Sequence, residues 1–206
     1  MSGISFIGAG NMASAIGAYA LKAGNTVEII SRDTAKSKTL ADKLGDGTTT
    51  GTWGDVPTGD IVILAVLFQS AVQVVNEFGD ALAGKILIDI TNPFNDDATG
   101  LAVPHDTSNA QLIAEAAPAS THVVKAFNTL FAPVLTSGVP VDVFMAGDDA
   151  KAKASVSAFI TSLGLRPRDA GDLSFAHWIE GAGLLEMGLA RNGLGFNFAL
   201  GVNTLG

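Results

Sequence analysis

Short apolar runs alternate along the chain with segments whose apolar residues recur at helical spacing. Apolar runs predict strands, and periods of three to four residues predict helices, since each element buries one side of its own repeat. Strands are predicted at residues 4–7, 26–31, 60–66, 85–90, 121–127, 142–146 and 166–169, with helices at 14–21, 34–44, 70–78, 108–115 and about 149–163. Strands that alternate with helices over short loops predict an α/β fold with a doubly wound, mostly parallel sheet.

The pattern changes at residue 172. A single helix is predicted over residues 173–190, and a tail rich in Gly and Phe follows, with no Lys or Arg beyond Arg191. An apolar, uncharged tail is poorly suited to solvent, so we expect it to pack on its own domain or on a second subunit. We therefore predict a cofactor-binding domain over residues 1–171 and a small helical C-terminal extension over 172–206, which completes a substrate pocket or a dimer contact.

The first predicted strand runs directly into Gly8-Ala9-Gly10-Asn11-Met12-Ala13, and a helix follows. In a strand–turn–helix of this kind the first Gly permits a tight turn, the second admits a pyrophosphate, and the small third residue lets the helix pack closely. We predict a Rossmann-like fold in which Gly8, Gly10, Asn11, Met12 and Ala13 bind a dinucleotide at the helix N-terminus.

The end of the second strand indicates which dinucleotide is bound. NAD-binding versions of this fold place a carboxylate there to bind the ribose 2′-hydroxyl. This chain has Ser31 and Arg32, with Lys36 one helical turn later, and such groups would bind a 2′-phosphate through charge-assisted hydrogen bonds. We therefore expect NADP. The alternative is NAD, because Asp33 could bind a ribose hydroxyl if the second strand ends later than predicted.

Composition narrows the classes of partner. The chain has 206 residues, of which 48% are hydrophobic and 16% charged, and its net charge is −8. This balance favours a compact domain and argues against nucleic acid or an anionic membrane as partner. There are no cysteines, so disulfides and thiolate chemistry are excluded. No signal peptide or membrane-spanning run is recognised, and we expect a cytoplasmic protein without a metal site.

The loops after three central strands should meet above the nicotinamide, because ligands of open α/β sheets bind beyond the carboxyl ends of the strands. We expect two sets of residues there. The first set contacts the cofactor: Ala65, Val66, Leu67, Asn92, Pro93, Ala126 and Asn128. The second set walls the substrate pocket: Phe68, Phe127, Phe131, His177 and Trp178.

No catalytic constellation is recognised. His105, His122 and His177 are isolated, and no Ser, Asp and His share a known spacing. Hydride transfer between two rings requires no general acid or base, since the cofactor carries the chemistry. We therefore assign no catalytic residue.

Several of these motifs together resemble the F420-dependent NADP oxidoreductases and their dinucleotide-binding relatives. The resemblance lies in the glycine turn, Ser31-Arg32, Ala65-Val66, the run 89–93 (DITNP) and the run 124–129 (VKAFNT). It implies a Rossmann-like NADP domain, a homodimer, and hydride transfer between NADP(H) and a deazaflavin (F420) or flavin-type acceptor.

The chain departs from the pattern of that family at two places. Leu67-Phe68 stands where relatives have Pro, and Ala176-His177-Trp178-Ile179-Glu180 stands where relatives have an Arg in the second position. Two alternatives therefore stay open. One is an NADPH-dependent reductase of an imine, a small carbonyl compound or a ferric chelate, and the other is a non-catalytic dinucleotide-binding module.

Overall fold

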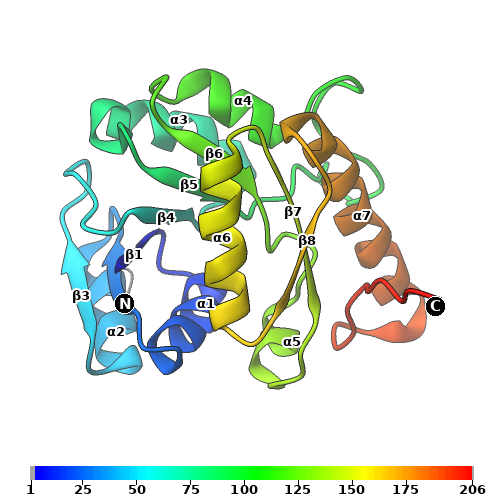
Figure 1. Cartoon of the computed structure of the whole chain (residues 1–206), viewed down its shortest axis with the longest axis horizontal. Coiled ribbons are helices and arrows are strands. Elements are labelled where there is room, and N and C mark those ends of the chain that lie inside the picture. The colour runs from blue at the N-terminus through cyan, green and yellow to red at the C-terminus, as the bar shows by residue number, and fades with distance from the viewer. Residues whose placement is uncertain (1–2, 206) are drawn as a thin grey trace.

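The computed structural model describes residues 3–205, and within them eight strands form one sheet in the order β3-β2-β1-β4-β5-β6-β7-β8 (Figure 1). β7 is antiparallel to β6, and the remaining neighbours are parallel. The prediction of a Rossmann-like, mostly parallel doubly wound sheet is confirmed. The strands are β1 (Gly3–Ile7), β2 (Thr26–Ile30), β3 (Thr48–Gly51), β4 (Ile61–Leu64), β5 (Ile86–Asp89), β6 (His122–Lys125), β7 (Asp142–Gly147) and β8 (Arg166–Asp169).

The helices differ from the predicted ones mainly at their ends. The helix predicted from residue 14 begins at residue 11, because the extended backbone of Gly10 serves as its N-cap. A short helix at 132–136, with a proline in its first turn, was not predicted. The helices are α1 (Asn11–Lys22), α2 (Thr34–Leu44), α3 (Phe68–Phe78), η1 (Gly79–Leu82), α4 (Asn109–Ala116), α5 (Ala132–Thr136), α6 (Ala150–Ser162), η2 (Leu173–Phe175), α7 (Ala176–Leu189) and η3 (Ala190–Leu194).

The prediction of one continuous helix over residues 173–190 was wrong. The segment starts with the 3-10 turn η2, continues as α7 and ends in the π-helical turn η3. Asn192 and Gly193 have non-helical dihedral angles inside η3, so the chain turns back at this point. No described helix has the length and apolar character that crossing a membrane requires.

Two hydrophobic clusters cover the two faces of the sheet. One cluster contains buried residues of α1, α2, α5 and α6, and the other contains residues of α3, α4, η2 and the first turn of α7. Figure 1 shows α6 in front of the strands, with α3 and α4 along the top of the molecule and α1 below. Because both faces are covered, the central strand β4 is buried along its whole length.

A buried ion cluster joins the middle of the sheet to the C-terminal helix. The Nζ of Lys125 at the end of β6 lies 2.8 Å from Asp89 Oδ2 and 3.0 Å from Glu180 Oε1, and all three side chains are fully buried. Lys125 also donates to the carbonyl of Thr91 at 2.6 Å. Burial raises the pKa of Glu180, and the charge of Lys125 opposes that rise.

Glu180 also holds the start of α4. Its two carboxylate oxygens accept hydrogen bonds from the backbone N–H groups of Asn109 and Ala110 at 3.1 and 3.3 Å. A carboxylate is stabilised at a helix N-terminus by these N–H groups and by the helix dipole. One buried side chain of α7 therefore fixes β6 and α4 together.

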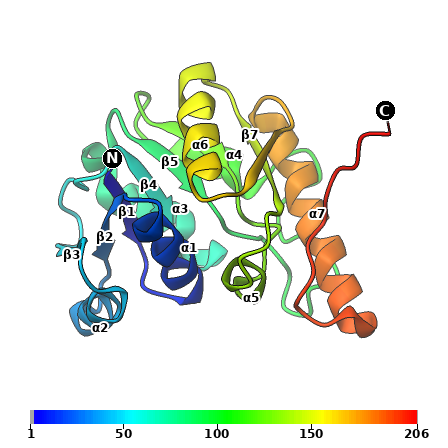
Figure 2. The same ribbon diagram turned by 60° about the horizontal axis from the view of Figure 1, so that its bottom comes forward.

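The C-terminal tail packs on its own domain. The N–H of Val202 donates to Asp142 Oδ2 at 2.7 Å, and Phe131 contacts the rings of Phe196 and Phe198 with centroids 5.2 and 5.8 Å apart. Figure 2 shows the tail returning along α7. Burial raises the pKa of Glu186, which faces the tail, to about 7. The predicted division into residues 1–171 and 172–206 stays a prediction. Residues 1, 2 and 206 of these two ranges lie outside the described residues.

Replacing Lys125 by Met is expected to destabilise the fold by about 3–5 kcal/mol, since two buried carboxylates lose their cation. The free energy of unfolding from urea titrations at pH 7 measures this. Lys36→Met is the matched control, because the side chain of Lys36 is 73% exposed and pairs with Asp33 only at 3.7 Å. An exposed ion pair contributes less than about 1 kcal/mol to the free energy of unfolding. If Lys125→Met lowers that free energy by no more than this, the structural role of the cluster is contradicted.

Candidate functional site

The turn between β1 and α1 is pressed against the end of β4. Gly8 has φ +119°, and a Cβ atom at this position would lie 2.1 Å from the carbonyl oxygen of Ala65. The N–H of Gly8 donates to Ile30 O at 2.8 Å, and the N–H of Ala65 donates to Ile7 O at 2.8 Å. Only glycine fits this backbone, both for its dihedral angle and for its space.

Gly10 is constrained differently, because a Cβ atom there would have no heavy atom within 4 Å among the described residues. It is the N-cap of α1, and within the described chain neither a capping side chain nor an acidic first-turn residue covers this helix end. The N-terminal N–H groups of α1 therefore face open space, an arrangement that suits an anion.

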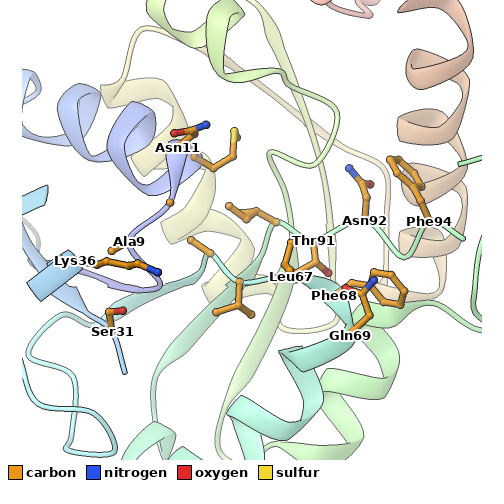
Figure 3. A pocket seen from close by; sticks show the side chains of 15 residues that line it. Ala9, Asn11, Ser31, Lys36, Leu67, Phe68, Gln69, Thr91, Asn92 and Phe94 are labelled. Atoms are coloured by element: carbon orange, nitrogen blue, oxygen red, sulfur yellow. The ribbon is translucent and has the colours of Figure 1, made fainter. Parts of the chain in front are cut away.

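A cavity of about 810 Å³ extends from this turn along the carboxyl ends of β1, β2, β4 and β5. Figure 3 shows Ser31 and Lys36 toward one end, with Asn92, Phe94 and Phe68 toward the other. Its lining residues come from the turn, the ends of the strands and the first turn of α3: Ala9, Gly10, Asn11, Met12, Ser31, Lys36, Ala65, Val66, Leu67, Phe68, Gln69, Ile90, Thr91, Asn92 and Phe94.

Most of this lining was predicted from the sequence. The predicted residues brought together are Gly10, Asn11, Met12, Ser31, Lys36, Ala65, Val66, Leu67, Phe68 and Asn92. Five further lining residues were missed: Ala9, Gln69, Ile90, Thr91 and Phe94. All five adjoin a predicted residue in the chain or stand two positions from one, so a wider window around each strand end would have included them.

Several predicted residues do not line this cavity. Ala13 and Ala126 are fully buried under the turn and at the end of β6. Phe127, expected in the pocket wall, is also fully buried; its φ is +62°, and it packs edge-to-face on Phe159 in the core. Phe131 lies against the C-terminal tail.

The residues predicted on the final helix also lie elsewhere. His177 Nδ1 is 2.8 Å from the carbonyl oxygen of Thr107, so this side chain attaches α7 to the loop before α4. Trp178 is 69% exposed and stacks edge-to-face on His177. Their expected place in a substrate pocket stays a prediction that would need a ligand or a second subunit beside α7.

Asn128 and Pro93 stand behind the cavity lining. Asn128 Nδ2 donates to Asn92 Oδ1 at 2.9 Å and to Ile179 O at 3.0 Å, while Asn92 Nδ2 donates to Asn128 O at 2.8 Å. Gly183 lets α7 pack directly on Asn92, since a Cβ atom at this position would lie 2.7 Å from Asn92 Oδ1. The amide of Asn92 is thus fixed by the loop after β6 and by the close approach of α7, and Pro93 beside it is buried.

Ser31 and Lys36 line the cavity, whereas the side chain of Arg32 contacts Glu77 and Trp53 beside it. Its Nη2 donates to Glu77 Oε1 at 2.6 Å, and its guanidinium lies 4.9 Å from the ring centroid of Trp53. Asp33, the alternative ribose ligand, accepts hydrogen bonds from the N–H groups of Ala35 and Lys36 as the N-cap of α2. Its carboxylate is therefore already engaged in capping.

Ionisable groups are scarce in the cavity. Lys36 is the one ionisable residue among the described residues that line it. His105 and His122 do not contribute; His122 lies 4.0 Å from Asp149 at the other end of β6. Within residues 3–205, no three His, Asp or Glu side chains are grouped so as to hold a metal ion. The half of the cavity around Phe68, Asn92 and Phe94 is aromatic and neutral.

Comparisons with known proteins find similar chains among oxidoreductases. Residues 3–93 match the family model described as NADP oxidoreductase, coenzyme F420-dependent. A solved structure from Arthrobacter sp. FB24, provisionally assigned as an F420-dependent NADP reductase, superposes with a TM-score of 0.86 at 25% identity, covering 98% of this chain and 99% of that one. The resemblance inferred from the motifs is confirmed.

Two further relatives are longer than this chain. Metalloreductase STEAP3 of Rattus norvegicus is 31% identical over 181 residues, which cover 86% of this chain and 35% of that protein. The F420-dependent NADP reductase of Methanocaldococcus jannaschii is 30% identical over 139 residues, covering 64% of this chain and 62% of the reductase. The chain thus spans about a third of one relative and less than two thirds of the other.

Replacing Gly8 by Ala is expected to destabilise the protein by more than about 2 kcal/mol, because the left-handed strain of about 1–2 kcal/mol adds to a clash with backbone. Gly24→Ala is the matched control: φ is +82° there, but an added Cβ would meet nothing within 4 Å. Urea unfolding of both variants measures the difference. Equal losses would mean that the contact with Ala65 does not constrain the turn.

Proposed function

We propose that this protein is an NADP-dependent oxidoreductase that transfers a hydride between NADP(H) and a planar acceptor of the deazaflavin (F420) or flavin type. The observation that carries the proposal is one continuous cavity, with a helix N-terminus that no described side chain caps and Lys36 in one half, and a neutral aromatic half beyond them. The family match over residues 3–93 supports the same class of cofactor.

The polar half suits the phosphates of NADP. The N–H groups at the start of α1 would bind the pyrophosphate, and Gly10 leaves room for its approach. Ser31 and Lys36 line the same half and would bind the 2′-phosphate by a hydroxyl and an ammonium group. A protein with a net charge of −8 needs such local cations to bind a polyanion.

The neutral half suits an acceptor that takes a hydride without a proton from the protein. Reduction of a carbonyl group or an imine adds a proton as well as a hydride, and a side chain or water must supply it. No ionisable side chain lines the cavity near Asn92 among the residues described. A flavin or deazaflavin ring asks only for stacking against the nicotinamide, and Phe68 and Phe94 offer flat apolar surface for it.

The contribution of the protein is then mainly positional. Hydride transfer depends on holding two rings at near-contact distance in the correct orientation, which converts a bimolecular step into an intramolecular one. Asn92, held by Asn128 and facing α7 at Gly183, is the rigid polar group at this end of the cavity. It would orient the carboxamide of the nicotinamide.

The match to a metalloreductase favours a second candidate, the reduction of a ferric chelate. Ferric iron accepts one electron, whereas NADPH delivers two as a hydride. A flavin that accepts the hydride and releases single electrons would connect the two, so this candidate also requires a flavin-type ring in the neutral half of the cavity. An imine or carbonyl reductase, or a binding module, would need no such ring.

A homodimer is part of the proposal. Leu194 and Phe196 of the returning tail are 59% and 49% exposed although apolar. A second subunit would cover such residues. If the intact chain sediments as a monomer, the homodimer is contradicted, while the proposed reaction is not affected.

The test has two stages. Fluorescence titration with NADPH asks whether the cofactor binds, and NADPH oxidation is then followed with F420, FMN, a cyclic imine, a small aldehyde and ferric citrate. We expect binding and turnover with F420 or FMN. Absence of NADPH binding would sink the proposal, turnover of the imine or aldehyde alone would favour that alternative, and binding without turnover would favour a binding module.

Arg32→Ala is expected to raise the Kd of NADPH about tenfold or more while changing that of NADH less than about twofold, since a guanidinium interacts with the 2′-phosphate that NADH lacks. Parallel fluorescence titrations measure both constants. Lys38→Ala is the control, because Lys38 is an exposed residue of α2, the helix that follows Arg32, and lies outside the cavity. Equal weakening of both cofactors would show that Arg32 does not recognise the 2′-phosphate.

A further inference from the structure

Trp53, Glu77 and Arg32 form a cluster beside the cavity that the proposed chemistry does not use. We propose that Trp53 and Glu77 are positioning residues for the guanidinium of Arg32, and that through it they determine the preference for NADPH over NADH. This inference rests on the proposed function and extends it to two residues outside the cavity lining.

The sheet brings the cluster to the cofactor edge. β2 and β3 are parallel, with Ile30 paired to Gly51, so Arg32 and Trp53 each stand two residues beyond a paired position on neighbouring strands. Ser31, between Ile30 and Arg32, lines the cavity. Parallel strands end at the same edge, and this is the edge at which dinucleotides bind in such sheets.

The contacts fix the guanidinium in two ways. Its carbon lies 4.9 Å from the centroid of the Trp53 ring, a cation–π distance. Glu77 Oε1 accepts from Arg32 Nη2 at 2.6 Å, which determines the rotation of the guanidinium.

The partners of Arg32 are themselves held. The indole Nε1–H of Trp53 donates to Glu77 Oε2 at 3.1 Å, and Gln73 Nε2 donates to Glu77 Oε1 at 2.8 Å. The ring of Trp53 packs edge-to-face on Phe78, with centroids 5.1 Å apart. The hydrogen bond from Arg32 lowers the pKa of Glu77, so its carboxylate stays ionised.

The arrangement leaves most of the guanidinium available. Within the described chain its hydrogen-bond acceptor is Glu77, reached by Nη2, and the side chain of Arg32 is 51% exposed. A guanidinium has five N–H donors and two faces, so the other edge can bind a phosphate while the face away from Trp53 can receive a purine ring. A pre-oriented guanidinium loses less side-chain entropy on binding than a mobile one.

The test is a double-mutant cycle on cofactor preference. NADPH and NADH titrations are made on wild type, Trp53→Leu, Arg32→Ala and the double variant. We expect Trp53→Leu to raise the Kd of NADPH about threefold to tenfold, the range of a cation–π contact, with NADH changed less than about twofold. In the Arg32→Ala background the same substitution should have little further effect.

Glu77→Gln is the second variant, because it leaves the Trp53 ring in place. It should also weaken NADPH selectively, and thermal unfolding shows whether either variant is merely less stable. An unchanged NADPH to NADH ratio in both variants, or an equal effect of Trp53→Leu with and without Arg32, overturns the inference. Tighter NADPH binding by Glu77→Gln overturns it as well, since Glu77 would then compete with the phosphate for Arg32.

Wild-type titrations separate this inference from the proposed function. If wild type does not bind NADPH, the function fails. If wild type binds NADPH and the cycle shows no coupling between Trp53 and Arg32, the inference fails alone.

Discussion

The buried charge of Lys125 is the constraint on which the central part of the structure depends. An ammonium group without water is tolerated only where carboxylates and carbonyls surround it, and here these come from Asp89, Glu180 and Thr91. Asp89 and Thr91 stand together at the end of β5, and Glu180 belongs to α7, where its carboxylate also accepts hydrogen bonds from the start of α4. Satisfying one charge therefore places the end of β5, the start of α4 and the middle of α7 around the end of β6.

The two halves of the cavity differ in how far apart in the sequence their supporting residues lie. The half at the glycine turn is built on a local unit, because strand, turn and helix follow one another in sequence, and Gly8 is required there by its positive φ and by its contact with Ala65 after β4. The other half is assembled from distant segments, since the amide of Asn92 is held by Asn128 and approached by Gly183. Rigidity there depends on tertiary packing.

This difference explains what could be predicted from the sequence. The glycine turn, Ser31 and Lys36, and the strand ends at Ala65 and Asn92 follow from local patterns and one rule about parallel sheets, and the structure brings them to one cavity. Phe127 was misplaced because an aromatic residue after a strand carries no mark of the direction of its side chain, and its positive φ turns it into the core. The engagement of Arg32 with Trp53 and Glu77 joins three elements, which no local pattern reveals.

The position of α7 against Asn92 has a consequence for how such a protein can diverge. The family match ends at residue 93, whereas Asn128 and Gly183, which hold Asn92, and Glu180, which pairs with Lys125, lie later in the chain. A lineage can therefore keep the cavity lining recognisable while it exchanges the later segments, and with them the frame around Asn92. The described residues that line the cavity all lie at or before residue 94, and the supports of Asn92 lie after it, so the lining and its frame are encoded in separate parts of the chain.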